Sequence, residues 1–258
     1  MKNLFKTILL AAIAPIVFTI VASAQSSNCA DDDYSCKVGA YTRQIASDPK
    51  NYEPYYSRGV AYENLKEYDQ AIADLTKYIA SNPVKKEYLA DGYHARGDVY
   101  HAQANDVKAV ADYSMAIQLF PTPGHYVNRG NAYQSMKDLV KAIYDYNRAI
   151  ALDVKEVEGY YNRARAYYKQ KLYSKAIADL DVYITLNQAK KDFLADGYWN
   201  RSNNYDAMGN LTQALKDVNS AIDLSAKAGM YTSRAALYRK QGKIALAEAD
   251  ERMAASMD

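Results

Sequence analysis

Three residues in the first half of the chain have types and spacing that could bind a metal ion. His94, Asp98 and His101 follow one another at intervals of four and three residues, which places their side chains on one side of a helix. Imidazole and carboxylate groups are common metal ligands, so a metal-dependent enzyme is one hypothesis. Helical spacing produces such triplets often, and one helix rarely supplies a full coordination shell. We therefore predict no metal site and no cofactor.

Other residue combinations that carry out catalysis are not found in the sequence. There is no glycine-rich phosphate-binding loop and no nucleophile elbow. The two cysteines both lie near the N-terminus, so a catalytic cysteine–histidine pair is not expected. The prediction is that the protein is not an enzyme.

The two cysteines, Cys29 and Cys36, are predicted to form a disulfide. They follow a predicted export signal, and an even cysteine count in an exported chain favours pairing. The bond would close a short loop and stabilise only the N-terminal tail. A zinc site is the weaker alternative because further ligands are missing nearby. Lipid attachment at Cys29 is also weak, since Ser26-Ser27-Asn28 does not match the residues that normally precede a lipidated cysteine.

The first 24 residues have the pattern of a cleaved export signal. Lys2 and Lys6 precede an apolar run over residues 8–22, and Ala22-Ser23-Ala24 provides the small residues at which signal peptidase cuts. A membrane anchor is the alternative, but a run of 15 residues is marginal for crossing a bilayer. We expect an exported protein, periplasmic or secreted, in a bacterial envelope.

The charge balance argues against binding to nucleic acid or to membrane surfaces. The formal net charge is +2, and Lys2 and Lys6 account for it, so the chain beyond the signal is neutral. Bulk electrostatic attraction to polyanions is therefore not expected. Beyond the signal, charged residues interrupt every apolar run, so no stable membrane span is predicted.

Six arginines and six aspartates recur together along the chain. The arginines are Arg58, Arg96, Arg129, Arg163, Arg201 and Arg234, and the aspartates are Asp74, Asp112, Asp145, Asp179, Asp217 and Asp250. A ladder of ligand contacts is one interpretation, but strict co-occurrence favours ion pairs between two helices. The tyrosines that flank each arginine at seven-residue spacing are assigned to packing.

These residues belong to a unit that occurs six times. The pattern Tyr-x-x-Arg-small-x-x-Tyr has its small residue at Gly59, Gly97, Gly130, Ala164, Ser202 and Ala235. The spacings between these positions are 38, 33, 34, 38 and 33 residues. Each copy continues into a second stretch with apolar residues three, four and seven apart, which predicts a helical hairpin.

The six units are organised as a duplicated block of three. The first three small residues map onto the last three with a constant offset of 105 residues, and the insertion at residues 85–93 returns at 190–198. The two blocks are therefore expected to present related surfaces to two similar ligand segments or to one long ligand.

The repeated unit resembles the tetratricopeptide (TPR) family over about residues 52–258. The departures are Tyr where the family often has Trp, Arg where it often has Leu, and Glu248 and Glu251 at apolar positions of the last helix. The resemblance implies an all-α, right-handed TPR solenoid of about six helix-turn-helix repeats with N- and C-terminal capping helices. The expected organisation is a signal peptide at 1–24, an N-terminal cap at 25–51, and repeats at 52–85, 90–122, 123–156, 157–190, 195–227 and 228–258.

The resemblance also implies that the first helix of each repeat lines a concave surface where a partner binds. Asn128, Asn162 and Asn200 each directly precede a repeated arginine, and Asn131 and Asn203 lie one turn further on. A carboxamide both donates and accepts hydrogen bonds, so such a row could hold the backbone of an extended peptide. The alternative is that asparagine is merely tolerated at a solvated position.

Aromatic and charged residues accompany the asparagines. Tyr56, Tyr161 and Trp199 are predicted partner contacts, although a core role for the single tryptophan is the alternative. Acidic residues are expected along the first two repeats, and basic residues such as Arg165 and Lys169 along the later ones. The basic pair that some TPR domains use to hold a C-terminal carboxylate is not predicted here.

The leading functional prediction is an exported TPR scaffold that binds an extended peptide or a partner protein in its concave groove. The alternative is a structural subunit that assembles with itself or with a complex through its ends and convex face. The sequence predicts neither the identity of the partner nor the oligomeric state.

Overall fold

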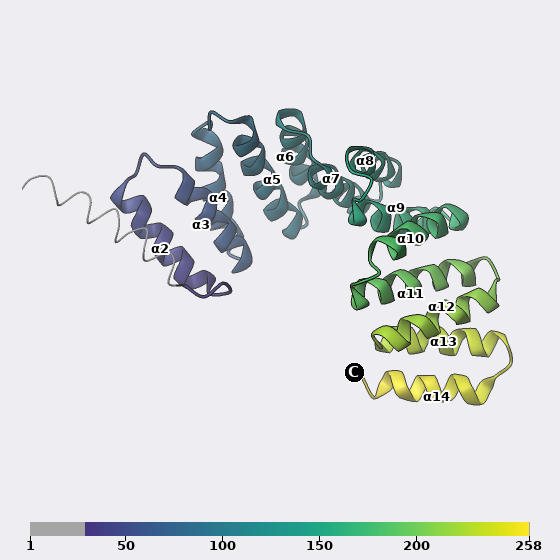
Figure 1. Cartoon of the computed structure of the whole chain (residues 1–258). Helices are drawn as coiled ribbons and strands as arrows, with labels where there is room; N and C mark the ends of the chain where they lie inside the picture. Colours follow the sequence, from purple (N-terminus) through teal and green to yellow (C-terminus); the bar gives the residue numbers. More distant parts are fainter. Residues whose placement is uncertain (1–28, 258) are drawn as a thin grey trace, which may run out of the picture. The chain divides into compact units, whose positions relative to one another are not determined.

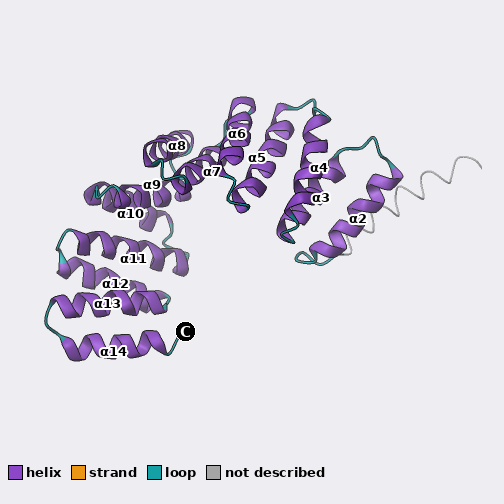
Figure 2. Ribbon diagram, turned by 180° about the vertical axis from the view of Figure 1, so that it is seen from behind, coloured by secondary structure: helices purple, strands orange, loops and turns teal. Residues whose placement is uncertain are grey.

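Thirteen α-helices and no strands make up the residues that the computed structural model describes, 29–257. Figure 1 and Figure 2 show them in chain order. Their bounds are α2 Tyr34–Ser47, α3 Glu53–Asn64, α4 Tyr68–Ala80, α5 Lys86–Ala102, α6 Asp106–Leu119, α7 Pro123–Ser135, α8 Leu139–Leu152, α9 Val157–Lys169, α10 Tyr173–Leu186, α11 Lys191–Ala207, α12 Leu211–Leu224, α13 Ala228–Lys240 and α14 Ile244–Ala255. The predicted signal peptide, residues 1–24, lies outside the described residues.

The helices form two compact units, which we call unit 1 (through Phe120) and unit 2 (from Pro121). In unit 1, α3 pairs with α4 and α5 with α6, and α2 packs against α3. In unit 2, the hairpins are α7 with α8, α9 with α10, α11 with α12, and α13 with α14. Within each unit a second helix also contacts the first helix of the following hairpin, as α8 does with α9. The predicted all-α TPR solenoid is confirmed.

Each hairpin is closed by small residues and a tight turn. The repeated alanine of each second helix is fully buried, at positions Ala71, Ala109, Ala142, Ala176, Ala214 and Ala247. One residue of every turn has a positive φ, between 58° and 78°, at Lys66, Ala104, Lys137, Lys171, Gly209 and Gly242. The close approach of the paired helices follows from the missing side-chain bulk at the alanine position.

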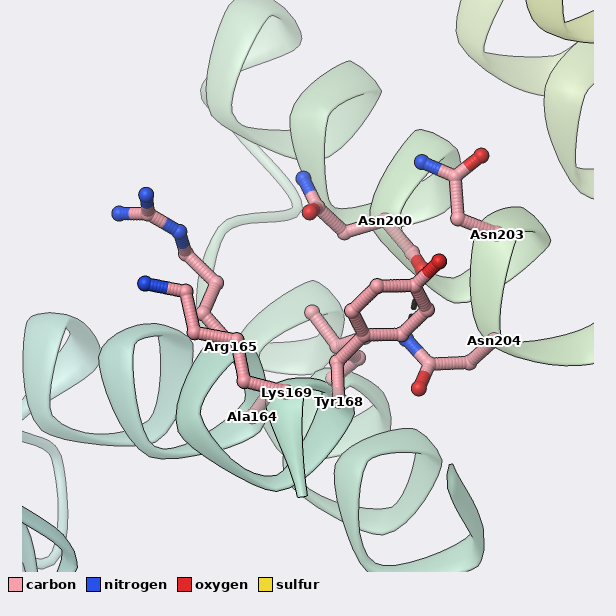
Figure 3. A pocket seen from close by; sticks show the side chains of 8 residues that line it. Ala164, Arg165, Tyr168, Lys169, Asn200, Asn203 and Asn204 are labelled. Carbon is pink, nitrogen blue, oxygen red and sulfur yellow. Dashed lines mark hydrogen bonds between the residues drawn. The ribbon is translucent and has the colours of Figure 1, made fainter. Parts of the chain in front are cut away.

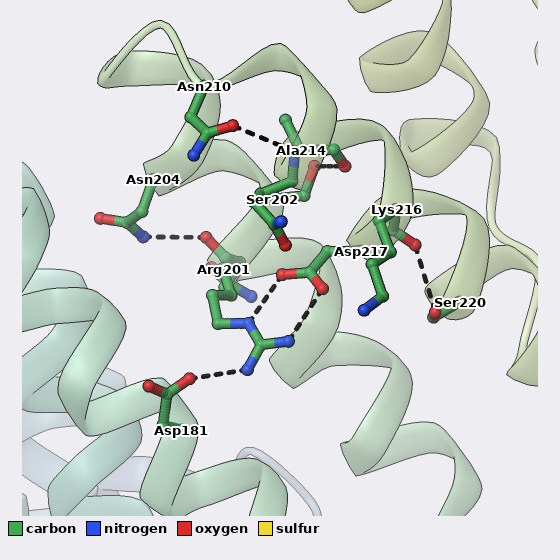
Figure 4. Close-up of polar contacts among 11 residues, drawn as sticks. Asp181, Arg201, Ser202, Asn204, Asn210, Ala214, Lys216, Asp217 and Ser220 are labelled. Atoms are coloured by element: carbon green, nitrogen blue, oxygen red, sulfur yellow. Dashed lines mark hydrogen bonds and ion pairs between the residues drawn. The ribbon is translucent and has the colours of Figure 1, made fainter.

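The predicted arginine–aspartate pairs form in all six repeats. In each, the guanidinium donates from Nε and Nη2 to the two carboxylate oxygens at 2.6–2.9 Å, and each aspartate is at most 6% exposed. Figure 4 shows one example, in which Arg201 holds Asp217 of α12 and donates a third bond to Asp181 of α10. Because the third bond reaches the preceding hairpin, Arg201 joins two repeats, as do Arg96, Arg163 and Arg234. A structural role is therefore the correct interpretation.

The first helices α5 and α11 are 17 residues long, against 12 or 13 for the other first helices. They begin at Lys86 and Lys191, about one turn before the repeat starts expected at residues 90 and 195. The residues added by the two 38-residue spacings thus extend the helix rather than the loop. Ala90 and Ala195, which directly follow these extensions, are fully buried.

The N-terminal tail is tied to α2. A disulfide joins Cys29 and Cys36, as predicted, and Asp33 caps the helix by accepting a bond from the Cys36 backbone N–H at 2.8 Å. Arg58 donates to Thr42 of α2, as Arg96 does to Thr76 of α4. The helix α2 therefore stands in the place of a second helix of a preceding repeat.

Candidate functional site

The asparagine row, which we define as Asn128, Asn162 and Asn200, lies entirely within unit 2. Its members occupy the same position on α7, α9 and α11, immediately before the arginine that anchors each first helix, and all three are half-buried. The Asn200 amide donates to the Asp196 carbonyl at 2.8 Å and to the Tyr161 hydroxyl at 3.2 Å. The second bond links α11 to α9 and orients the Asn200 carboxamide.

The two asparagines one turn further on have different surroundings. The Asn131 oxygen accepts a hydrogen bond from the buried Tyr146 hydroxyl at 2.8 Å, so this side chain helps to close its own hairpin. The hairpin of α5 and α6 repeats the contact, since Tyr113 donates to Asp98 at 2.7 Å. At the equivalent register of α12 the residue is Val218 instead of a tyrosine, and Asn203 lines a cleft. Asn131 and Asn203 were both expected to extend the asparagine row. Asn131 instead packs within its hairpin, whereas Asn203 lies at the surface of the cleft.

Tyr161 lies between the core and the solvent. Its ring packs against Tyr183 with centroids 4.9 Å apart, and the Arg165 guanidinium lies 5.7 Å from the ring centroid. Its hydroxyl accepts the bond from Asn200, so the ring edge is fixed beside the asparagine row.

Trp199 is held between two first helices. Its indole N–H donates to the Ser233 hydroxyl of α13 at 2.9 Å, and a Cβ placed on Gly229 would lie 2.9 Å from the ring. The indole also packs against the core formed by α11, α12 and α13. Because this packing uses the N–H and one ring edge, a partner would contact only the exposed remainder of the ring.

Tyr56 belongs to unit 1 and has acidic surroundings. Its ring lies 5.1 Å from that of Tyr78, and burial together with the charges of Asp91 and Asp98 raises its pKa. Burial, with a contribution from Asp98, raises the pKa of Glu63 to about 7. The first helices of unit 1 thus carry the acidic character expected from the sequence.

An open cleft of about 140 Å³ lies between α9, α10 and α11, and Figure 3 shows its lining. We call it the α9–α11 cleft, lined by Ala164, Arg165, Tyr168, Lys169, Leu180, Asn200, Asn203 and Asn204. The first helices that flank the cleft, α9 and α11, carry the small residues Ala164 and Ser202, which are separated by one of the two 38-residue spacings. Asn200 and Asn203 were predicted as site residues, whereas Asn204 was not.

The three residues proposed for metal binding are not brought together. His94 Nδ1 lies 3.6 Å from the Asp98 carboxylate, whereas His101 pairs with Asp106 at the start of α6. Among residues 29–257 the structure contains no group of three or more histidine, cysteine or acidic side chains that could hold a metal ion. No helix in that range is both long and apolar enough to cross a bilayer.

Comparison with known proteins identifies the repeat. Three family models described as tetratricopeptide repeats match residues 40–73, 125–155 and 157–190. Small glutamine-rich tetratricopeptide repeat-containing protein 2 of Saccharomyces cerevisiae is 32% identical over 90 residues, which is 35% of this chain and 25% of that protein. The chain thus matches about a quarter of this relative. The matched segments are tetratricopeptide repeats.

Solved structures share the fold at low sequence identity. The C-terminal part of a TPR repeat-containing protein from Cytophaga hutchinsonii superposes with a TM-score of 0.71 at 18% identity, covering 93% of this chain and 95% of that one. YrrB, described as a TPR protein with an unusual peptide-binding site, gives a TM-score of 0.59 at 18% identity, with coverage of 78% and 98%. The TPR fold supports a role as a protein-interaction scaffold.

Proposed function

We propose that the protein is an exported scaffold that binds an extended polypeptide along the first helices of unit 2. The observation that carries the proposal is the asparagine row, three carboxamides at one register on α7, α9 and α11. An extended peptide offers backbone donors and acceptors along its length, and a carboxamide satisfies either kind. Binding through the backbone would accept many peptide sequences.

Neighbouring features support the same surface. Tyr161 is fixed beside the row, and the α9–α11 cleft opens next to it. YrrB, which has the same fold, is described as having a peptide-binding site. Two aromatic residues, Tyr161 and the exposed part of Trp199, would supply apolar contact at the surface where the backbone is held.

Export is part of the proposal. It rests on the signal pattern of residues 1–24 and is consistent with the Cys29–Cys36 disulfide, since disulfides persist in oxidising compartments. Expression of the full chain in a bacterial host, followed by N-terminal sequencing of the periplasmic fraction, should give a mature protein that starts at Gln25. A cytoplasmic product that retains Met1 would contradict export.

Peptide binding is tested with a random library of 12-residue peptides displayed on phage. Peptides selected on the mature protein are expected to lose at least tenfold in affinity on the Asn128→Ala/Asn162→Ala/Asn200→Ala variant. A matched control replaces three exposed carboxamides outside the row, Gln103, Gln118 and Gln188, with alanine and should bind normally.

The outcomes separate the two functional hypotheses. Peptides that bind the asparagine variant as well as the wild-type protein would exclude the row as the binding surface. They would favour the alternative of a complex-organising subunit that uses its ends and convex face. Circular dichroism of each variant would confirm that the helical fold is retained.

A further inference from the structure

We propose that the α9–α11 cleft binds the side-chain carboxylate of an aspartate or glutamate within the bound polypeptide. The inference rests on the proposed function, because it names the residue type that one subsite of the peptide surface selects. It is carried by two cations, an apolar floor and a buried carbonyl oxygen, all within unit 2.

The cations are Arg165 and Lys169, four residues apart on α9. Both are exposed, and in Figure 3 both side chains extend in the same direction from the helix. Among the described residues, no carboxylate forms a salt bridge with either of them, whereas Lys227 and Lys240 of the same unit are paired with Asp196 and Asp206. A carboxylate placed between Arg165 and Lys169 would accept charge-assisted hydrogen bonds from both.

The floor of the cleft suits the methylene groups of an acidic side chain. Ala164 and Leu180 are buried at its base, and the Tyr168 ring forms one wall. The opposite wall carries Asn200 and Asn203. The side chain of a glutamate or aspartate could thus pass over apolar atoms and end at the cations on the rim.

Asn204 gives an independent sign of a ligand. The residue is 3% exposed, its amide donates to the Asn200 carbonyl at 2.8 Å, and its side-chain oxygen has no hydrogen-bond partner. Buried acceptors without a partner cost free energy and are rare in native structures. A backbone N–H of the bound peptide would supply the missing donor.

The first block of the duplication shows that the fold does not require this asparagine. The offset of 105 residues places Val99 at the equivalent position, and Val99 is fully buried. By the same offset, the residues of the first block equivalent to Arg165, Tyr168 and Asn203 are Val60, Glu63 and Asp98. The equivalent surface of unit 1 is therefore acidic and would repel a carboxylate, so the preference is a property of unit 2.

The occupant is a side chain rather than a chain terminus because the proposed peptide surface continues on both sides of the cleft. Asn128 and Asn162 lie on α7 and α9, and Trp199 reaches from α11 to α13 on the other side. A peptide that contacts both groups passes through the cleft and does not end in it.

The experiment uses the same display library, in which the peptide is fused at its C-terminus and so has no free terminal carboxylate. Selected peptides are expected to share an acidic residue at one position. A synthetic peptide with an amidated C-terminus should bind at least ten times more weakly, by fluorescence anisotropy, when that residue is replaced by its amide. The acidic peptide and its amide counterpart should bind equally to the Arg165→Gln/Lys169→Gln variant. The control is Lys175→Gln/Lys216→Gln, which alters exposed lysines of second helices, and it should keep the difference in affinity between the two peptides.

Each result has one meaning. If no peptide is selected, the proposed function fails together with this inference. If peptides depend on the asparagine row but show no acidic preference, or if the preference persists in the Arg165→Gln/Lys169→Gln variant, only this inference fails. Recovery of the lost affinity by a free C-terminal carboxylate would assign the cleft to a chain terminus and overturn the proposal.

Replacement of Asn204 tests the donor contact separately. The Asn204→Val variant copies the first block, so its urea midpoint should be equal to or above that of the wild-type protein while peptide affinity falls severalfold. A lower midpoint with unchanged affinity would assign Asn204 to the fold alone and overturn that contact.

Discussion

At the scale of single residues, the repeated arginines each make several hydrogen bonds at once. Arg163 donates to both oxygens of Asp179, also bonds Asn147 of the preceding hairpin, and lies within 6.0 Å of the centroids of the Tyr160 and Tyr167 rings. The tyrosines assigned to packing thus also enclose a guanidinium. The planar group and its fixed fork of donors explain why arginine, and not lysine, recurs at this position.

The first prediction concerns this ion pair. Asp179→Ala should lower the free energy of unfolding by about 3–5 kcal/mol, because it leaves a largely buried guanidinium without its carboxylate. The double variant Arg163→Met/Asp179→Leu should cost much less, since no buried charge is left unpaired. Urea unfolding followed by circular dichroism measures both. Glu251→Ala, which breaks the exposed pair with Arg239, is the control and should change little. Equal losses for the single and double variants would contradict the argument.

A second residue-scale prediction is a dependence of stability on pH through Glu63. Its pKa rises from an ordinary 4.5 to about 7, chiefly by burial, with Asp98 of the neighbouring α5 adding to the effect. The folded state therefore binds this proton more tightly than the unfolded state does. The stability it contributes is complete below about pH 4.5 and is lost as the pH rises toward 7.

Glu63→Gln should consequently gain stability over the wild-type protein between pH 5 and pH 8. The measurement is the difference between the two urea midpoints at a series of pH values. His94, Asp98 and Tyr113 lie on the elements packed nearby and are unchanged in the Glu63→Gln variant. Glu53→Gln, at an exposed position of the same helix, is the control. A difference that stays constant with pH would refute the assignment to Glu63.

At the scale of helices, the small residues of the first helices make room for bulky residues of the second helices. A Cβ on Gly97 or Gly130 would lie 2.6–2.7 Å from the ring of Tyr113 or Tyr146, which are fully buried. In the α9–α10 hairpin, where Leu180 replaces the tyrosine, the small residue is Ala164. Gly59 faces Leu75 at the same register, so a leucine across the hairpin occurs with glycine in one repeat and with alanine in another. The bulk of a tyrosine ring therefore accounts for Gly97 and Gly130 only.

The third prediction tests the packing of Gly130 against the Tyr146 ring. Gly130→Ala should lower the free energy of unfolding by about 1–3 kcal/mol, because the fully buried Tyr146 ring has no room to move. Gly124→Ala on the same helix meets no atom within 4 Å and should stabilise the protein by about 0.4–1 kcal/mol. Adding Tyr146→Leu to Gly130→Ala, which copies the α9–α10 hairpin, should recover part of the loss. Thermal unfolding of the four proteins provides the comparison, and a stabilised Gly130→Ala variant would contradict the packing argument.

The helices and their pairing into hairpins could be predicted from the sequence far better than individual side-chain contacts between them. The period of the repeat fixes which residues face the partner helix, so the hairpins, the buried alanines and the arginine–aspartate pairs all follow from spacing. The bond from Trp199 to Ser233 and the bond from Tyr146 to Asn131 depend on side-chain rotamers and on how neighbouring hairpins pack, which spacing does not specify. The buried Asn204 did leave a signal, since the 105-residue offset replaces a core valine with an amide.

At the scale of the whole molecule, stability in a repeat array is a sum of contributions from each repeat and its nearest neighbours. Within unit 2, the printed contacts of these arginines reach the neighbouring hairpin, as Arg201 does with Asp181 and Arg234 with Asn219. A defect should therefore spread to adjacent hairpins and weaken with distance. The division into unit 1 and unit 2 marks where such spreading is expected to be weakest.

The fourth prediction measures that spreading by amide hydrogen exchange. Asp217→Ala removes the carboxylate from the buried pair in the α11–α12 hairpin, so exchange should accelerate in α9 to α14 while α3 to α6 keep their wild-type protection. The mirror variant Asp112→Ala, in the α5–α6 hairpin, should give the opposite pattern. The two variants remove the same bidentate contact, one in each unit. Uniform acceleration in both variants would mean that the two units unfold as one cooperative structure.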